Sequence, residues 1–369
     1  MTPPTLDIHI QNKTSSSNVS AYITGQALNH NNHVVLVKSD GKSLYYPESP
    51  SEILQPLKED CAIPLGRPGS TTTVTIPQIA GGRIWFSVDS RLTFLLNPGP
   101  AVVEPSVSNP TDPSINAKWG FCEFTYNSSQ LYANISYVDF VSLPIAMGLV
   151  PGAGPEQVVQ GLKEDGLERI CTGLMAQGGD WEKLIFKADG KNLRVLSPNN
   201  AIVMNQGNLF RGYYDAYVNE AWSKYAKCPL TVDTQAEWGK VEGRVHGDEL
   251  KFDKVGASFN KPSTGDIFGC SSGPFANNAG AAGPLTARIS AALNRSTLLD
   301  NDSHPHKEKV ENYYQHQVTN HYARLVHEAN KDGRGYAFPY DDVAPGGGGI
   351  DQSGFVSDGN PKTFTVIVG

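Results

Sequence analysis

Two carboxylates occupy neighbouring strand-like stretches of GFCEFTYNSSQLYANISYVDF, residues 120–140. They are Glu123 and Asp139, and both lie among aromatic and β-branched residues. A pair of carboxyl groups can hydrolyse a glycosidic bond: one protonates the leaving oxygen, and the other activates water or attacks directly. The acid must stay protonated near neutral pH, which burial beside aromatic groups favours. These two residues are the first candidates for catalysis.

The strand predicted around Glu123 has two different faces, because side chains alternate along a strand. Cys122, Phe124 and Tyr126 can point into a core. Glu123 and Thr125 then project together from the opposite face. From these residues alone, the simpler alternative is a solvent-facing acid on the polar side of a half-buried strand.

A serine nucleophile is a second possibility for catalysis. The stretch GCSSG, residues 269–273, matches the nucleophile-elbow pattern with Ser271 as the nucleophile. That motif requires a helix immediately after the serine, but Pro274 and a stretch rich in Asn and Gly follow. A Gly/Ser turn is therefore favoured over a serine esterase.

The sequence contains no strong metal-binding pattern. Three histidines, His316, His321 and His327, fall in one predicted helix, but the HExxH spacing is absent. Solvated helix histidines are favoured over metal ligands. The five cysteines are scattered without a CxxC pair, which argues against a zinc site and against a disulfide framework.

Composition and charge narrow the classes of partner. The formal net charge of −7 disfavours binding to a nucleic-acid backbone and permits a neutral ligand such as a sugar. No apolar run approaches the roughly 20 residues that span a bilayer, so no membrane partner is expected. The N-terminus lacks the features of a signal peptide. Six N-x-Ser/Thr sequons nevertheless favour a secreted protein whose signal is not part of this sequence; they lie at Asn12, Asn18, Asn127, Asn134, Asn294 and Asn301.

Hydrophobic periodicity predicts an α+β protein. Alternation over 5–38, 71–88 and 120–148 indicates antiparallel strands, and the Pro-, Asn- and Ser-rich residues 97–118 indicate a long loop. A D-G turn within 183–196 predicts a hairpin. Helical spacing appears in 155–177, 213–227, 286–299 and 307–333, and the tail at 362–369 is a strand again.

These elements predict a discontinuous β-domain, a sandwich or barrel, formed by residues 1–148 and 334–369. A mixed α/β segment, residues 149–333, is inserted between the two parts.

Several stretches resemble the thaumatin-like superfamily: GGRIWFSV (81–88), CEFTYN (122–127), ISYVDFVSLPIAM (135–147), and GYAFPYDD (335–342) followed by FTVIV. Plain thaumatin-like proteins are shorter and hold many disulfides. The large insertion and the few cysteines instead resemble glycoside hydrolase family 64, endo-β-1,3-glucanases of the laminaripentaose-producing type. This resemblance implies a thaumatin-like β-domain and an α/β domain on either side of a wide groove.

The resemblance also implies roles for individual residues. Glu123 falls on the family's catalytic Glu, as general acid, and Asp139 on its catalytic Asp, as general base of an inverting hydrolysis. Substrate contacts are implied for Thr125, Asn127, Tyr132, Asp341 and Asp342. Where many thaumatin-like proteins carry an arginine two residues after the tryptophan of IW, this chain has Ser87.

The implied partner is a β-1,3-glucan polysaccharide or oligosaccharide, bound by a monomer without a metal or organic cofactor. A non-catalytic thaumatin-like β-glucan-binding protein is the alternative, since it would keep the groove without a positioned acid and water.

The spacing of the two acids sets a geometric condition. In a straight hairpin around NSSQ, residue 123 faces residue 134, and Asp139 lies five residues further on, about 17 Å away. An inverting pair needs about 6.5–9.5 Å between its carboxyl groups. The chain is therefore predicted to bulge or leave the ladder near residues 137–138, so that Asp139 returns over the groove.

Overall fold

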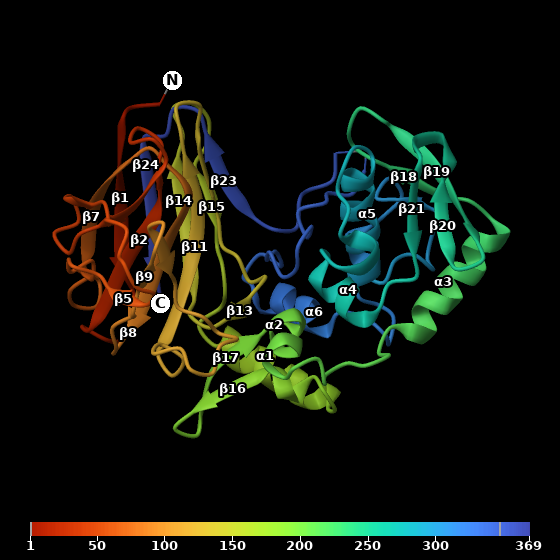
Figure 1. The fold of residues 1–369 in the computed structure, drawn as a ribbon, viewed down its shortest axis with the longest axis horizontal. Helices are drawn as coiled ribbons and strands as arrows, with labels where there is room; N and C mark the ends of the chain where they lie inside the picture. The colour runs from red at the N-terminus through yellow and green to blue at the C-terminus, as the bar shows by residue number, and fades with distance from the viewer. Residues whose placement is uncertain (1, 347) are drawn as a thin grey trace.

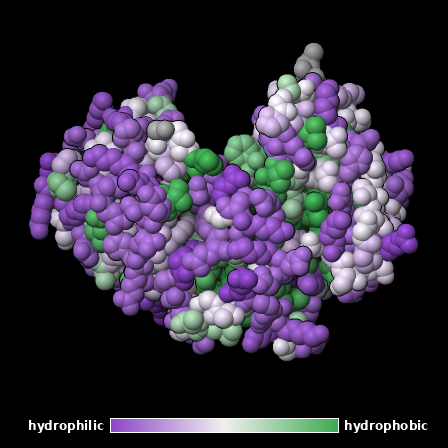
Figure 2. All heavy atoms as spheres, turned by 180° about the vertical axis from the view of Figure 1, so that it is seen from behind, coloured by the Kyte–Doolittle hydropathy of each residue, from purple (hydrophilic) through white to green (hydrophobic). Residues whose placement is uncertain are grey.

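The computed structural model describes residues 2–346 and 348–369 and shows a mixed α+β protein with several antiparallel sheets. A lobe of strands contains both chain ends, and a second lobe contains helices around a smaller sheet (Figure 1). Helices α1, α2 and α6 lie between and below the two lobes in this view. In space filling, seen from behind, the outline is indented between the lobes (Figure 2).

The larger sheet of the β-lobe has the strand order β23-β12-β11-β8-β2-β3-β4, with β6 paired to β2. Its strands span Val19–Ala27 (β2), His33–Val37 (β3), Leu44–Tyr45 (β4), Ile63–Pro64 (β6), Ile79–Val88 (β8), Lys118–Tyr126 (β11), Leu131–Asn134 (β12) and Phe355–Asp358 (β23). The central strands β2, β8 and β11 are antiparallel neighbours, as the period-2 alternation predicts.

The second sheet of the β-lobe has the order β15-β14-β24-β1-β7. Its strands span Thr5–Asn12 (β1), Thr71–Pro77 (β7), Ile145–Val150 (β14), Gln157–Val159 (β15) and Thr363–Val368 (β24). The first and last strands of the chain, β1 and β24, pair in parallel, while β1 pairs antiparallel with β7. The two sheets contact one another where the Tyr126 hydroxyl of β11 donates to the carbonyl oxygens of Pro3 and Thr5.

The second lobe pairs helices with the sheet β21-β20-β19-β18-β22. Its elements are α3 (Asp215–Lys227), α4 (Thr264–Gly269), α5 (Ala282–Asn294), β18 (Leu230–Asp233), β19 (Lys240–His246), β20 (Glu249–Phe252), β21 (Ala257–Asn260) and β22 (Ser303–His304). The apolar face predicted for α3 is confirmed, because Val218, Trp222 and Tyr225 are buried.

The remaining elements include two three-stranded sheets, β10-β9-β5 and β13-β17-β16. They are α1 (Gly166–Gln177), α2 (Pro198–Met204), α6 (His321–Ala329), β5 (Gln55–Pro56), β9 (Leu95–Asn97), β10 (Ala101–Val103), β13 (Phe140–Val141), β16 (Ile185–Ala188) and β17 (Lys191–Leu196). Short 3-10 helices lie at Glu182–Leu184, Asp253–Val255, Gly273–Phe275 and Val310–Asn312. The predicted D-G hairpin is confirmed as β16–β17, with both Asp189 and Gly190 at positive φ.

The helix predicted for 155–177 is wrong in its first half. Residues 157–159 form β15, which pairs with β14, and α1 begins only at Gly166. Gly161 ends the extended segment at φ +64, where a Cβ atom would overlap the carbonyl oxygen of Ile145. The close approach to β14 therefore overrides the helical spacing. Strand β15 also lies past the predicted domain boundary at residue 148, and the division into two domains stays a prediction.

The helix predicted for 307–333 is also mostly wrong. Only α6 is helical at length, and Asn320 caps its start by accepting a hydrogen bond from the Ala323 amide. Tyr314 has φ +62, which breaks a helix, yet its side chain is buried. The aromatic spacing reflects burial of an irregular segment and not one helix face. The stretch 335–342 is likewise irregular, with a single bridge between Tyr336 and Ser136.

The cysteines, the membrane-span criterion and the glycosylation sequons can each be compared with the structure. All five cysteines are free thiols. Within the described residues, no helix is both long and apolar enough to cross a membrane. Three sequon asparagines, Asn12, Asn134 and Asn294, are buried and cannot accept a glycan in the folded chain. Those three sequons therefore do not support secretion.

Candidate active site

Strand β11 places Glu123 as the alternation predicts. Cys122, Phe124 and Tyr126 are buried, while Glu123 and Thr125 are half-buried on the opposite face. The buried face points toward the sheet of β1, where Tyr126 forms its hydrogen bonds. Glu123 consequently projects from the outer face of the larger sheet.

Neighbouring strands bring polar partners beside Glu123. Across β12 its pairing partner is Asn134, as predicted for the hairpin, and across β8 its partner is Arg83. Thr125 pairs with Tyr132 in the same way. Side chains directly opposite one another in a sheet point to the same face, so these five residues gather on one surface.

That surface forms a hollow of about 430 Å³, lined among others by Arg83, Glu104, Glu123, Thr125, Tyr132 and Asn134. The Tyr132 ring stacks on Phe355 with centroids 5.2 Å apart, which provides an aromatic platform at the edge of the hollow. Burial, followed by the charges of Asp351 and Asp342, raises the pKa of Tyr132 to about 12. Tyr132 is therefore a neutral hydroxyl at physiological pH.

Arg83 is the closest charged neighbour of Glu123. Its Nε lies 3.1 Å from Glu123 Oε1, and its Nη1 lies 2.6 Å from Glu104 Oε2. The side chains of Arg83 and both glutamates remain about one-third exposed. The ion pair therefore stays open to solvent and does not seal Glu123 away. The group beside the Glu123 carboxylate is thus an arginine.

The chain leaves the β11–β12 ladder before it reaches Asp139. Strand β12 ends at Asn134, and the next backbone contacts are made to Tyr336, through the bridge from Ser136 and the hydrogen bond from the Tyr137 amide. The predicted departure is confirmed, but it begins near Ile135, about two residues earlier than expected.

Asp139 is held by the start of helix α2 through both its backbone and its side chain. Its carbonyl oxygen accepts a hydrogen bond from the Ser197 amide at 2.9 Å, and Asn200 Nδ2 lies 3.0 Å from Asp139 Oδ1. The adjacent Phe140 packs against Trp119 and Phe121 of β11, at centroid distances of 4.7 and 5.9 Å.

Phe121 and Glu123 share one face of β11, because they are two residues apart. The Phe140 contact thus returns the Asp139 segment over the face that carries Glu123. Asp139 itself is half-buried.

Comparison with known protein families identifies the family of the whole chain. A family model described as Beta-1,3-glucanase, for glycoside hydrolase family 64, matches residues 4–368. The chain belongs to glycoside hydrolase family 64.

Relatives within family 64 are recognisable at moderate identity. A glucan endo-1,3-beta-glucosidase of Cellulosimicrobium cellulans is 32% identical over 299 residues, and one of Arthrobacter sp. (strain YCWD3) matches equally well. The alignments cover 79% of this chain and 52% of each relative, so this chain spans about half their length.

Solved structures show the same fold. The crystal structure of a laminaripentaose-producing beta-1,3-glucanase in complex with laminaritetraose is 31% identical, with a TM-score of 0.88 over 99% of this chain and 98% of that chain. A beta-1,3-glucanase domain from Clostridium beijerinckii is 20% identical, with a TM-score of 0.76 over 99% of this chain and 98% of that one.

Two of the residues expected to contact substrate in a family 64 protein have other roles. Asp341 is fully buried, with Arg295 Nη2 at 3.2 Å and His327 Nε2 at 2.8 Å, so a sugar cannot reach it and the prediction is wrong for this residue. Asn127 accepts hydrogen bonds from the amides of Ser129 and Gln130, which close the β11–β12 turn. Its side-chain oxygen is therefore already used.

Asp342 differs from its buried neighbour Asp341. It is accessible and lines a second hollow with Arg288 and Tyr340. Partial desolvation, followed by the charge of Asp351, raises the pKa of Asp342 above its usual value. The charge of Asp342 also contributes, after burial and Asp351, to the raised pKa of Tyr132.

The alternative catalytic groups are not assembled. Ser271 follows helix α4 and the left-handed Cys270, whereas a nucleophile elbow follows a strand, so the Gly/Ser turn is the correct interpretation. His316 lies outside α6 and contacts Asp300 at 2.8 Å. His321 is buried, which contradicts its prediction as a solvated histidine.

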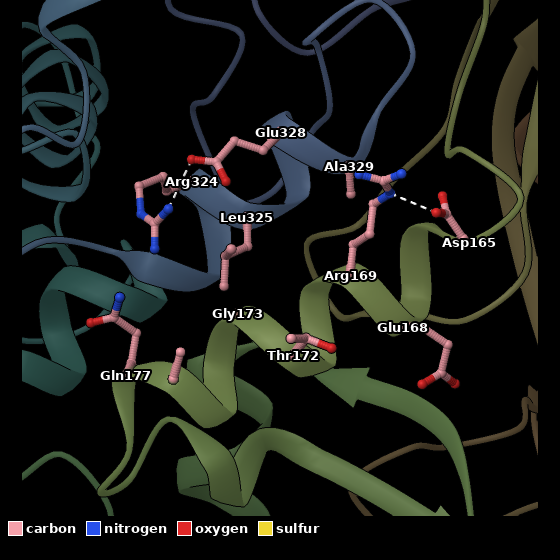
Figure 3. Close-up of a pocket in the computed structure, with 11 residues that line it drawn as sticks. Asp165, Glu168, Arg169, Thr172, Gly173, Gln177, Arg324, Leu325, Glu328 and Ala329 are labelled. Carbon is pink, nitrogen blue, oxygen red and sulfur yellow. Dashed lines mark hydrogen bonds and ion pairs between the residues drawn. The ribbon is translucent and has the colours of Figure 1, made fainter.

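A larger hollow of about 560 Å³ lies between α1 and α6, away from the candidate acids (Figure 3). Its arginines are already paired, Arg169 with Asp165 at 2.7 Å and Arg324 with Glu328 at 2.8 Å. Gly173 allows Leu325 to pack closely where the two helices meet. The hollow is a groove between two packed helices, and each of its two arginines is paired with a carboxylate.

Sequence reasoning missed the residues that surround Glu123 and hold Asp139. Arg83 lies within the GGRIW stretch, two residues before Trp85 on the same face of its strand, whereas the expected position, Ser87, is fully buried. The alternation of β8 could have indicated Arg83. Glu104 lies in the predicted loop and had no such signal.

A buried charge cluster fixes the segment that contains Asp341. His327 Nδ1 contacts the Gly333 carbonyl oxygen and Nε2 contacts the Asp341 carboxylate. Both partners accept, so both ring nitrogens donate and the imidazole is charged. Burial lowers the pKa of His327, but the charge and hydrogen bond of Asp341 outweigh it and raise the pKa overall, against a smaller opposing effect of Arg295.

This linkage predicts a loss of stability at alkaline pH. A raised native pKa stabilises the fold below about pH 6.5, the usual histidine value, and the stabilisation disappears as pH rises through the native value. We expect the urea midpoint to fall between pH 6 and pH 9 by more in the wild type than in His327→Gln. If the urea midpoints of the wild type and His327→Gln changed with pH in parallel, that result would contradict a charged His327 in the folded protein.

Proposed function

We propose that this chain is an endo-acting glycoside hydrolase that cleaves β-1,3-glucan with inversion. Glu123 is the general acid and Asp139 the general base, and laminaripentaose is the main product. The observation that carries the proposal is the return of the chain after Asn134, which brings the Asp139 segment over the Glu123 face of β11 through Phe140. The proposed product size is that of the laminaripentaose-producing structural relative.

The proposed substrate groove is the indentation between a thaumatin-like β-domain and the inserted domain (Figure 2). In this arrangement Tyr132 and Phe355 provide a stacking surface for a sugar ring. Thr125 and Asp342 bond sugar hydroxyls from the two sides. Asn127 and Asp341 are left out, because their side chains are committed to the turn and to the buried cluster.

The reaction is a single displacement. Protonated Glu123 donates its proton to the glycosidic oxygen as the bond to C1 breaks. Asp139 removes a proton from the water that attacks C1 from the opposite face. Asn200 holds one Asp139 oxygen, and the other has no hydrogen-bond partner among the described residues and can accept that proton. Arg83 stabilises the negative charge that Glu123 acquires.

Release of reducing ends from laminarin tests this function. The wild-type chain is expected to generate new reducing ends, with products dominated by a five-sugar oligosaccharide. A protein that binds laminarin but releases no reducing ends would instead be the non-catalytic β-glucan-binding alternative.

A further inference from the structure

Glu104 belongs to the proposed site although no motif marks it. One guanidinium contacts two carboxylates: Arg83 Nη1 lies 2.6 Å from Glu104 Oε2, and Arg83 Nε lies 3.1 Å from Glu123 Oε1. Glu104 therefore makes the shorter contact. Both glutamates line the same hollow.

The Glu104–Arg83 pair is fixed from two sides. The buried Thr24 hydroxyl lies 3.3 Å from Glu104 Oε1, and it accepts a hydrogen bond from Trp85 Nε1 at 3.0 Å. The Arg83 guanidinium also lies over the Phe121 ring, 4.8 Å from its centroid. These contacts give the arginine one orientation toward Glu123.

We propose that Glu104 is a positioning residue that, through Arg83, keeps Glu123 available as an acid. This inference rests on the hydrolase function proposed above. An unshared guanidinium beside Glu123 favours its ionised form, which cannot donate a proton. With Glu104 present, Arg83 is already neutralised while Glu123 is protonated. After proton donation, the same guanidinium lies between two negative charges and stabilises both.

Other titratable groups near Glu123 do not take over the effect that Glu104 exerts on Glu123 through Arg83. Burial raises the pKa values of Tyr132 and Tyr336, so both remain neutral in the assay range. Cys122 points to the opposite face of β11, and burial raises its pKa as well. Asp139 is the only other acid assigned to the reaction, and it acts on water from the far side of the sugar.

The test is the pH profile of kcat/KM on laminarin for Glu104→Gln. We expect its alkaline limb to move to lower pH by roughly 1 unit, the low end of the effect of a neighbouring charge, while the acid limb stays in place. In an Arg83→Met background, which keeps an apolar stem over Phe121, adding Glu104→Gln is expected to cause no further shift. Glu59→Gln is the matched control, because Glu59 pairs with Lys38 at 2.9 Å outside the hollow and is similarly exposed.

Three results would overturn the inference in an active wild type. The first is a pH profile of Glu104→Gln whose alkaline limb lies at the same pH as in the wild type. The second is a shift of equal size in the Arg83→Met background, because Glu104 would then not act through Arg83. The third is loss of turnover at every pH with an unchanged melting temperature, which would make Glu104 the acid itself. A wild type that does not hydrolyse laminarin would instead remove the proposed function, and the inference with it.

Discussion

Replacing Glu123 by Gln is expected to lower kcat on laminarin by roughly 10²–10⁴-fold, the usual contribution of a general acid. Glutamine has nearly the same shape as glutamate and can still accept a hydrogen bond from Arg83 Nε, but it has no proton to donate. Because Glu123 is one-third exposed, the substitution should not disturb the core. Reducing-sugar release under saturating laminarin measures the loss directly.

Two controls separate loss of chemistry from loss of structure. Glu123→Gln is expected to keep the wild-type melting temperature and to bind laminarin in a calorimetric titration. Glu59→Gln removes an equivalent charge from an ion pair elsewhere and should hydrolyse laminarin at the wild-type rate. Wild-type turnover by Glu123→Gln would reject this residue as the acid.

The second large effect is expected on stability, from Arg295→Met. Arg295 is fully buried, with Nη2 3.2 Å from Asp341 Oδ1 and Nη1 3.6 Å from Glu308 Oε2. It also donates to the carbonyl oxygens of Val343 and Asp341, each at 2.9 Å. Removing one partner from a buried ion pair typically costs about 3–5 kcal/mol, because the remaining charge and acceptors lose their donor. Urea unfolding at neutral pH measures this loss of free energy.

A surface pair provides the comparison. Arg169 pairs with Asp165 at 2.7 Å on an exposed part of α1, and Arg169→Met is expected to leave the urea midpoint unchanged. If Arg295→Met were as stable as Arg169→Met, the cluster around Asp341 would not hold the segment that presents Asp342.

The parts of the fold that could be predicted have a local cause. Alternation along β11 placed Glu123 and Thr125 on one face and Cys122 in the core, and the structure agrees. The Asp189–Gly190 turn and the buried face of α3 were equally readable, because turn chemistry and helical spacing act within a few residues.

The parts that could not be predicted depend on contacts distant in sequence. Arg83 meets Glu123 only through the register of β8 against β11. Asp139 returns because Phe140 packs on Phe121, a contact that no spacing within 120–140 specifies. Tyr314 shows the converse, since its helix-like spacing comes from burial beside His327, at a ring distance of 5.7 Å, and not from a helix.

The family resemblance of the sequence implies Glu123 and Asp139 as the two acids, and the proposed mechanism places a physical requirement on each. Glu123 must release a proton beside a cation that is shared with Glu104. Asp139 must accept one while Asn200 holds it in place. Both requirements concern one event, the attack of a water molecule on the face of the sugar opposite the leaving group.

Proton NMR of laminarin hydrolysis, followed from the first minutes, observes the stereochemistry of that event. Water delivered by Asp139 opposite to the leaving group should produce new reducing ends as the α-anomer, with β-anomer signals growing only later by mutarotation. Early accumulation of the β-anomer would show retention of configuration, and it would contradict the assignment of Glu123 and Asp139 as an inverting pair.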